Sequence, residues 1–341
     1  MLSRGADSLY WLARYTERMD ALARLIETAL RLSAIAEEGD EWRSAIIASG
    51  AHEGFDKKYE ETQPDRAIEY LMLDPDNSSS VVSCIENART NARAMRTSLT
   101  REMWEIVNET WQEGRQIIAR DLLPERLPDT LDWVKRRTLL FNGAYSASML
   151  RYDGFSFTRL GTFMERADNT ARLVDVKYHV LLPDHAGVGG FVDHAQWMSV
   201  LQAASAVRSY HWLYHQKVKP WNVAELMILS PEMPRSLRYC YDEIRTHLDF
   251  IQGLYGHRPA ECQRLAGQID ARLRYGRIEQ IFQEGLHEFL TDMIDTTADL
   301  NKEIARQYMG AEKPKPEDGD LSQSQSQGVA QNSLDVDPAE A

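Results

Sequence analysis

The segment TERMDALARLIE at residues 16–27 returns as MERADNTARLVD at residues 164–175. Six of the twelve positions are identical, whereas unrelated segments of ordinary composition agree at roughly one position in fifteen. Around the first copy, apolar residues recur at steps of three and four, which places them on one side of an α-helix. The segment therefore predicts an internal duplication that is built on a charged, amphipathic helix.

Further matches continue the duplication in the same order along the chain. The matched pairs are Trp42 and Trp197, Glu69 and Glu225, Leu73 and Leu229, Pro75 and Pro231, Ser80 and Ser236, and Cys84 and Cys240. The separation changes from 148 to 155 and then to 156 residues, so a small insertion distinguishes the halves. We place it in the glycine-rich stretch 182–190, which has the composition of a loop.

The proline-free intervals are rich in helix-forming residues and predict long helices. They are residues 1–63, 76–123, 129–182 and 260–313. Alternating strand patterns are nearly absent, and the run 225–229 is interpreted as a buried helix that ends before Ser230-Pro231. The predicted fold class is all-α, with two tandem, duplicated multi-helix halves packed about a shared core with pseudo-two-fold symmetry.

We expect a first helical repeat over residues 1–150 and a second over residues 151–310, joined without a linker near Asp153-Gly154. Residues 311–341 hold seven acids against two lysines and almost no large apolar side chain, which predicts a disordered acidic tail.

Bulk composition excludes several classes of protein. The net charge of −13 argues against nucleic-acid binding, which needs lysine and arginine gathered on one face. Three cysteines without a C-x-x-C spacing fit a reducing compartment. The chain shows neither a signal peptide nor an apolar run of about 18 residues, so we expect a cytoplasmic protein that does not enter a membrane.

The repeated charges are the main candidates for a functional site. On a helix, Glu17, Asp20 and Arg24 fall within an arc of about 60°, opposite the apolar side. The same holds for Glu165, Asp168 and Arg172, while Arg18 and Arg166 point toward the border of the core.

Three interpretations of these charges stay open. They form a solvated helix face with ordinary pairs four residues apart, or buried Glu–Arg pairs that hold the halves in register. Alternatively, the two stripes meet in a cleft that binds the charged end of an amino acid or peptide. The substrate-binding residues would then be Glu17, Arg18, Asp20, Arg24, Glu165, Arg166, Asp168 and Arg172, and Glu17 and Glu165 would be the candidates for acid–base catalysis.

The other candidate site residues give weaker evidence of a metal, thiol or anion site. His211 and His215 have the spacing of metal ligands but no further ligand pair accompanies them, so no metal site is predicted. Cys84 and Cys240 stand beside apolar positions and are expected to be buried. Ser80 and Ser236 are expected to begin helices, and Arg235 could assist an anion at the second of these helix starts.

Separated motifs resemble the alpha-E family, a bacterial all-helical group named for a Glu-Arg motif. They are residues 1–11 (MLSRGADSLYW), Glu17-Arg18, Asp132-Trp133-Val134, Leu160-Gly161, Glu165-Arg166-Ala167-Asp168 and Pro234-Arg235-Ser236. The resemblance covers about residues 1–310, and the family motif maps onto Glu17-Arg18 and Glu165-Arg166.

The resemblance also implies partners. Members of the family are typically encoded beside, or fused to, a circularly permuted ATP-grasp protein, often with a transglutaminase-like peptidase and sometimes with a proteasome-like peptidase. This chain has no nucleotide-binding loop, so ATP and Mg²⁺ are expected on the partner, with no cofactor in the chain itself.

Three functions follow as hypotheses. The preferred one is an accessory or substrate-binding partner of an ATP-grasp peptide or amide ligase system, without activity alone. The first alternative is an enzyme that itself forms or cleaves an amide by Glu acid–base catalysis. The second is a purely structural helical adaptor.

Overall fold

The computed structural model describes residues 3–34, 40–120, 125–180, 191–256 and 258–310. Within these ranges every regular element is a helix, which confirms the all-α class. The helices are α1 (Ser3–Ser33), α2 (Asp40–Ala48), α3 (His52–Lys58), α4 (Pro64–Met72), α5 (Val81–Ala94), α6 (Arg101–Arg120), α7 (Leu127–Ser148), α8 (Asp153–Val180), α9 (Phe191–Ala203), α10 (Val207–Tyr214), α11 (Pro220–Leu229), α12 (Leu237–Tyr255), α13 (Glu261–Tyr275), α14 (Ile278–Glu284) and α15 (Leu286–Tyr308). The stretch 182–190 and the tail 311–341 lie outside the described residues.

The helices are shorter than the proline-free intervals that predicted them. The interval 76–123 holds both α5 and α6, because α5 ends at Ala94 and the backbone leaves the helical region at Met95. The prediction for 225–229 is confirmed: α11 ends at Leu229, and Ser230 is extended before Pro231, as the residue preceding a proline prefers.

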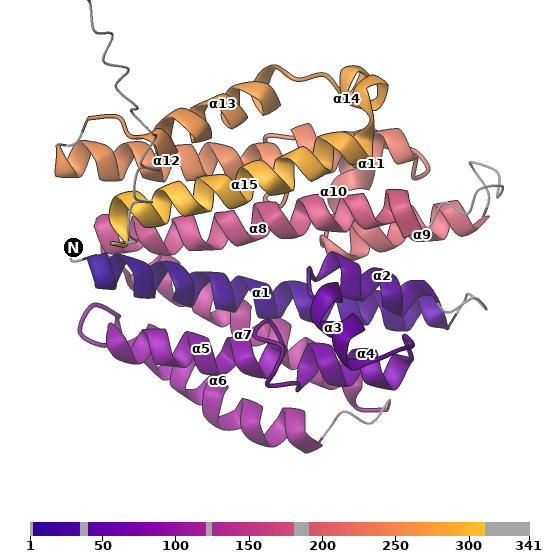
Figure 1. The fold of residues 1–341 in the computed structure, drawn as a ribbon, viewed down its shortest axis with the longest axis horizontal. Coiled ribbons are helices and arrows are strands. Elements are labelled where there is room, and N and C mark those ends of the chain that lie inside the picture. The colour runs from indigo at the N-terminus through magenta and orange to yellow at the C-terminus, as the bar shows by residue number, and fades with distance from the viewer. Residues whose placement is uncertain (1–2, 35–39, 121–124, 181–190, 257, 311–341) are drawn as a thin grey trace, which may run out of the picture. The chain divides into compact units, whose positions relative to one another are not determined.

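Two parallel helices, α1 and α8, lie side by side through the middle of the described residues (Figure 1). Their contacts keep a nearly constant difference in residue number, as between Tyr10 and Gly161 and between Glu17 and Arg166. At Gly161 the backbones approach so closely that an added Cβ would lie 2.1 Å from the Tyr10 carbonyl oxygen. Glycine at this position allows α1 and α8 to meet.

The other helices surround this pair (Figure 1). α1 packs against α5 and α7, which α6 also contacts, while α8 packs against α12 and α15, which α13 also contacts. Contacts also cross between the segments before and after residue 150, because α2 packs on α8 and α9 packs on α1. None of the described helices combines the length and the apolar composition that crossing a membrane would need.

The buried apolar side chains form three clusters, and α1 contributes to all of them. Leu9 belongs to a cluster with α8 and α12, Ile26 to one with α2, α4 and α5, and Leu12 to one with α6 and α7. Residues Met1–Ala311 accordingly pack as one unit.

The turns that precede α5 and α12 have the same local structure. The Oγ of Ser80 accepts a hydrogen bond from the Ser83 N–H, and the Oγ of Ser236 accepts one from the Tyr239 N–H. Each serine therefore caps the helix that follows it, as the sequence predicted. These turns carry Ser79 and Arg235 beside the charged residues of α1 and α8.

Candidate functional site

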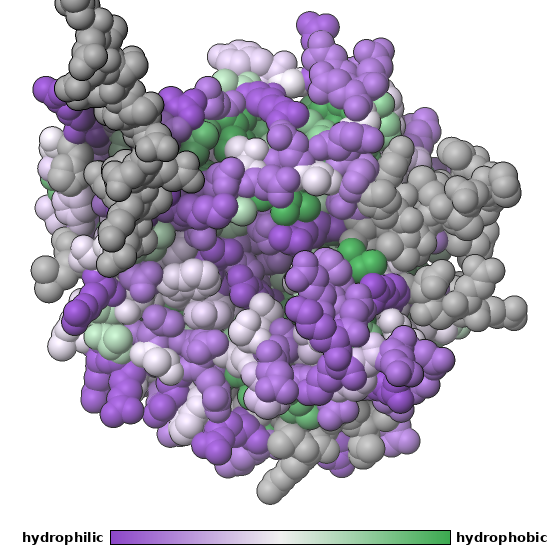
Figure 2. Space-filling model, viewed as in Figure 1, coloured by the Kyte–Doolittle hydropathy of each residue, from purple (hydrophilic) through white to green (hydrophobic). Residues whose placement is uncertain are grey.

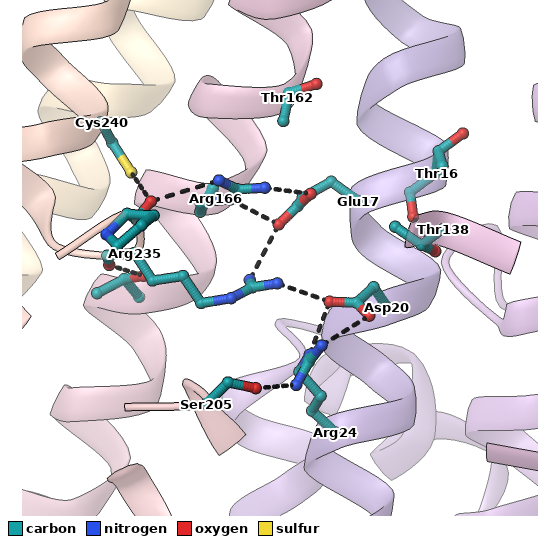
Figure 3. Close-up of polar contacts among 12 residues, drawn as sticks. Thr16, Glu17, Asp20, Arg24, Thr138, Thr162, Arg166, Ser205, Arg235 and Cys240 are labelled. Carbon is teal, nitrogen blue, oxygen red and sulfur yellow. Dashed lines mark hydrogen bonds and ion pairs between the residues drawn. The ribbon is translucent and has the colours of Figure 1, made fainter. Parts of the chain in front are cut away.

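A network of buried charges surrounds Glu17 of α1 (Figure 3). Arg166 of α8 grips the Glu17 carboxylate at two points, with Nε 2.8 Å from Oε1 and Nη2 2.9 Å from Oε2. Arg235, from the turn before α12, donates to Glu17 Oε1 over 2.9 Å and to Asp20 Oδ2 over 2.8 Å. One guanidinium thus bridges two carboxylates on successive turns of α1.

The same network continues along α1 through Asp20 (Figure 3). Arg24 donates to Asp20 Oδ2 from Nε over 2.7 Å and hydrogen-bonds the Ser205 hydroxyl through Nη1. The side chain of Asp20 is 1% exposed. Arg24 and Arg235 together donate to both carboxylate oxygens of Asp20, so the chain itself supplies its partners.

A second network surrounds Glu165 of α8. Arg18 of α1 donates from Nε to Glu165 Oε1 over 2.6 Å and from Nη2 to Oε2 over 3.0 Å. Arg14 donates from Nε to Glu165 Oε2 over 2.7 Å and from Nη1 to Asn301 Oδ1 over 2.9 Å. The Glu17–Arg166 and Glu165–Arg18 pairs are therefore reciprocal: each helix supplies a glutamate to the other helix's arginine.

These contacts fix the charge of both glutamates. Burial alone would raise their pKa, but the guanidiniums of Arg166 and Arg235 lower the pKa of Glu17 to about 2, and those of Arg18 and Arg14 do the same for Glu165. A carboxylate with this pKa is a weak base at neutral pH. Both side chains are therefore suited to binding a neighbouring positive charge.

The charged stripe does not form the solvated side of a helix opposite the core. Glu17, Asp20 and Glu165 are each 1% exposed. The physical reason is the central position of α1, whose second side is covered by α8 and α9 while its first packs against α5 and α7. Asp168 and Arg172 are the exception, since their side chains keep 20% and 29% exposure.

That exposure belongs to a polar pocket of about 300 Å³ beside the second network. The pocket lies between α1, α8 and α15, and the face over these helices is largely hydrophilic and recessed near its middle (Figure 2). It is lined by Arg14, Arg18, Ser49, Gly50, Ser79, Met164, Glu165, Asp168, Asn169, Arg172, Thr297, Ala298, Asn301 and Lys302. Beside the first network, the space next to Arg24 and Arg235 is only about 30 Å³.

The eight predicted binding residues divide between these two places. Arg18, Glu165, Asp168 and Arg172 line the polar pocket. The other four are held in the buried network around Glu17, and of them Arg24 also borders the small space; they are Glu17, Asp20, Arg24 and Arg166.

Several further residues belong to the site but lie outside the repeated charged stripe. Arg14 lies one helical turn before Arg18, so its place on the same side of α1 could have been found from spacing. Asn301 and Lys302 come from α15, about 130 residues beyond α8, and no local pattern signals them. Arg235 contacts carboxylates of α1, rather than assisting an anion at the start of α12.

The remaining candidates show no comparable site. Cys84 and Cys240 are buried, as predicted, and burial raises the pKa of each thiol to about 12. His211 and His215 are both exposed. Within the described ranges, no three His, Cys, Asp or Glu side chains are placed to hold a metal ion.

A protein-family model matches most of the chain. The Alpha-E family model, described as a predicted alpha-helical domain with a conserved ER motif, matches residues 1–309. The dipeptide Glu-Arg occurs three times in the chain, and the occurrences at 17–18 and 165–166 form the reciprocal pairs, whereas Glu125-Arg126 is exposed at the start of α7. Two of the three Glu-Arg dipeptides of the chain therefore bind each other.

Similar proteins include uncharacterized proteins of Mycobacterium bovis and of two strains of Mycobacterium tuberculosis. Each is 23% identical over 317 residues, which cover 85% of this chain and 35% of the relative. The chain therefore spans about a third of the length of these relatives. No solved structure matches the chain.

Proposed function

Because the chain belongs to the Alpha-E family, we propose that it binds the charged end of an amino acid or peptide in the polar pocket, as an accessory subunit of an ATP-grasp amide ligase. The observation that carries this proposal is the composition of the pocket wall. Four basic side chains, Arg14, Arg18, Arg172 and Lys302, face two acidic ones, Glu165 and Asp168. The pocket is thus net positive in a chain of net charge −13.

Both signs of charge in the pocket have a use in binding an amino acid. Arginine forks and lysine bind carboxylates, and Asp168 is a partner for an amine. A volume of about 300 Å³ lies at the lower end of the range for small-molecule sites. The ligand would therefore be one amino acid or the end of a short peptide.

The two networks also support an origin by duplication with pseudo-two-fold symmetry. Ser80 and Ser236, 156 residues apart, both cap helices. Gly50 and Ser205, 155 residues apart, both have positive φ, a conformation that is rare for serine. In this view the copy around Glu17 became a closed structural brace, and the copy around Glu165 kept an open pocket.

The ATP-grasp partner follows from the family resemblance and from the absence of a nucleotide-binding loop in the sequence. ATP and Mg²⁺ would be bound by that partner, and a transglutaminase-like peptidase would act in the same pathway. Affinity purification of the chain after co-expression with its genomic neighbours tests this: an ATP-grasp protein in stoichiometric amount is expected, and its absence would contradict the proposal.

Binding in the pocket is tested separately by isothermal titration with amino acids and dipeptides. Arg172→Gln should weaken binding at least tenfold, because it removes a donor from the pocket wall. Arg24→Gln is the matched control, since Arg24 occupies the corresponding position in the closed network and should not affect the dissociation constant. Equal effects of the two substitutions would argue against this pocket.

A purely structural role is the second candidate, and the burial of the reciprocal Glu–Arg pairs favours it. It predicts that Glu17→Gln together with Glu165→Gln lowers the melting temperature but leaves pathway activity unchanged. Mass spectrometry of the products made by the co-expressed genes provides the measurement of activity.

A further inference from the structure

The two charge networks share one framework but differ in two polar groups. By the separations of 156 and 155 residues, Arg235 corresponds to Ser79 and Ser205 corresponds to Gly50. The network around Glu17 holds the larger residue at both positions. The network around Glu165 holds the smaller one at both, and it is the one with the open pocket.

The first difference leaves a place for a cation. In the closed network, Arg235 bridges Glu17 Oε1 and Asp20 Oδ2. In the open network, Ser79 is too short to do so, and its hydroxyl accepts a hydrogen bond from Arg18 over 3.0 Å. Among the described residues, only Arg18 then donates a hydrogen bond to Glu165 Oε1, and only Arg172 donates one to Asp168.

Arg14 does not replace the missing guanidinium. In the closed network, Arg235 donates to Glu17 Oε1, the same oxygen that accepts from Arg166 Nε. In the open network, Arg14 donates to the other oxygen, Glu165 Oε2. Glu165 and Asp168 both line the pocket, and no guanidinium of the described residues fills the side between Glu165 Oε1 and Asp168. The side-chain exposure of Asp168, 20% against 1% for Asp20, reports this difference.

The second difference leaves a place for an acceptor oxygen. In the closed network, the Ser205 hydroxyl is hydrogen-bonded to Arg24 Nη1. Gly50 has a similar backbone conformation, with φ of 72° against 55°, and it lies beside Arg172 Nη1 but has no hydroxyl. Among the described residues, neither Nη atom of Arg172 has a hydrogen-bond partner, and the Nδ2 of Asn169 in the pocket wall is buried without one.

We propose that the ligand of the pocket carries a guanidinium group, which bridges Glu165 and Asp168 as Arg235 bridges Glu17 and Asp20, and a carboxylate that accepts from Arg172. This inference rests on the proposed function and specifies its substrate class as free arginine or an arginine at a peptide C-terminus. A guanidinium fits better than an ammonium because its planar fork reaches two carboxylates at once. The carboxylate would accept from the Nη atoms of Arg172, which have no partner among the described residues.

The test is isothermal titration of the full chain with L-arginine, L-citrulline, agmatine and L-alanine. Citrulline has the shape of arginine with a neutral ureido group, and agmatine lacks the carboxylate. L-Arginine should bind at least tenfold more tightly than each of the other three. Ser79→Arg should abolish arginine binding by supplying its own guanidinium, while Ser78→Arg adds the same charge at the neighbouring exposed position and should leave binding intact.

A third variant keeps the test decisive if Ser79→Arg does not fold. Asp168→Asn should reduce the preference for arginine over citrulline to less than threefold. If citrulline or alanine binds as tightly as arginine, the guanidinium site is overturned but amino-acid binding in the pocket stands. If none of the four ligands binds with a dissociation constant below about 10 mM, the arginine proposal fails, and the dipeptide titration decides whether the pocket binds a peptide end.

Discussion

Replacing Glu17 by Gln should destabilise the fold strongly, because it removes a negative charge from between two buried guanidiniums. The pKa of Glu17 falls from an ordinary 4.5 to about 2 in the folded chain. At about 1.4 kcal/mol per pK unit, the folded state favours the ionised side chain by about 3 kcal/mol. This agrees with the 3–5 kcal/mol or so that breaking a buried ion pair costs.

Urea unfolding at pH 7 measures the effect, which corresponds to a fall in melting temperature of roughly 6 °C for a chain of this size. Glu105→Gln is the control, since Glu105 pairs with Arg101 on the surface, where the side chains are 49% and 84% exposed. An exposed pair four residues apart contributes less than about 0.5 kcal/mol. If Glu17→Gln cost no more than Glu105→Gln, the buried network would not stabilise the fold as we argue.

Three further predictions follow from the same structure. The pKa of both Glu17 and Glu165 is lowered to about 2 in the folded chain, so their contribution to stability is complete above the unfolded pKa of about 4.5 and is lost as the pH falls toward 2. Urea unfolding at pH 7, 4 and 3 should therefore show a smaller loss of unfolding free energy with falling pH in the variant with both glutamates replaced by Gln than in the unmodified chain. Gly161→Ala should lower the unfolding free energy by about 2 kcal/mol or more, because the added Cβ would force α1 and α8 apart. At Gly143 an added Cβ meets nothing within 4 Å, so Gly143→Ala should be neutral or stabilise α7 by about 0.5–1 kcal/mol. Thermal unfolding compares the two variants, and equal melting temperatures would contradict the close approach of α1 and α8. The three cysteines are buried and the pKa of each thiol is raised. A reagent that reacts with thiols by disulfide exchange should therefore modify none of them in the folded chain and all of them in urea. Rapid reaction of the folded chain would show instead that the thiols are accessible.

The helical class and the helix starts were predictable because they depend on local signals. The spacing of apolar residues, the two capping serines and the proline after Ser230 act within a few residues of the chain. The positions of the breaks inside the proline-free intervals were not predictable in the same way. They depend on where a helix must turn to cover its neighbours.

The candidate site was predictable only in part. The repeated Glu-Arg dipeptides identified the residues, but a helical projection of α1 could not show that both of its sides would be covered. Arg235 reaches Glu17 from 218 residues away, and that contact exists only because the turn before α12 lies against α1. Alignment of the two copies does place Ser79 opposite Arg235, so the difference between the open and the closed network was present in the sequence.

The reciprocal arrangement of Glu17–Arg166 and Glu165–Arg18 has a mechanical consequence. Since α1 and α8 run in the same direction, sliding α1 along its axis brings one pair closer and pulls the other apart, and sliding it backwards does the reverse. Movement of α1 in either direction along its axis therefore lengthens one of the two ion pairs. A shear between these helices is a costly way to respond to a ligand. The pocket wall formed by α1 and α8 should therefore keep its shape when a ligand binds.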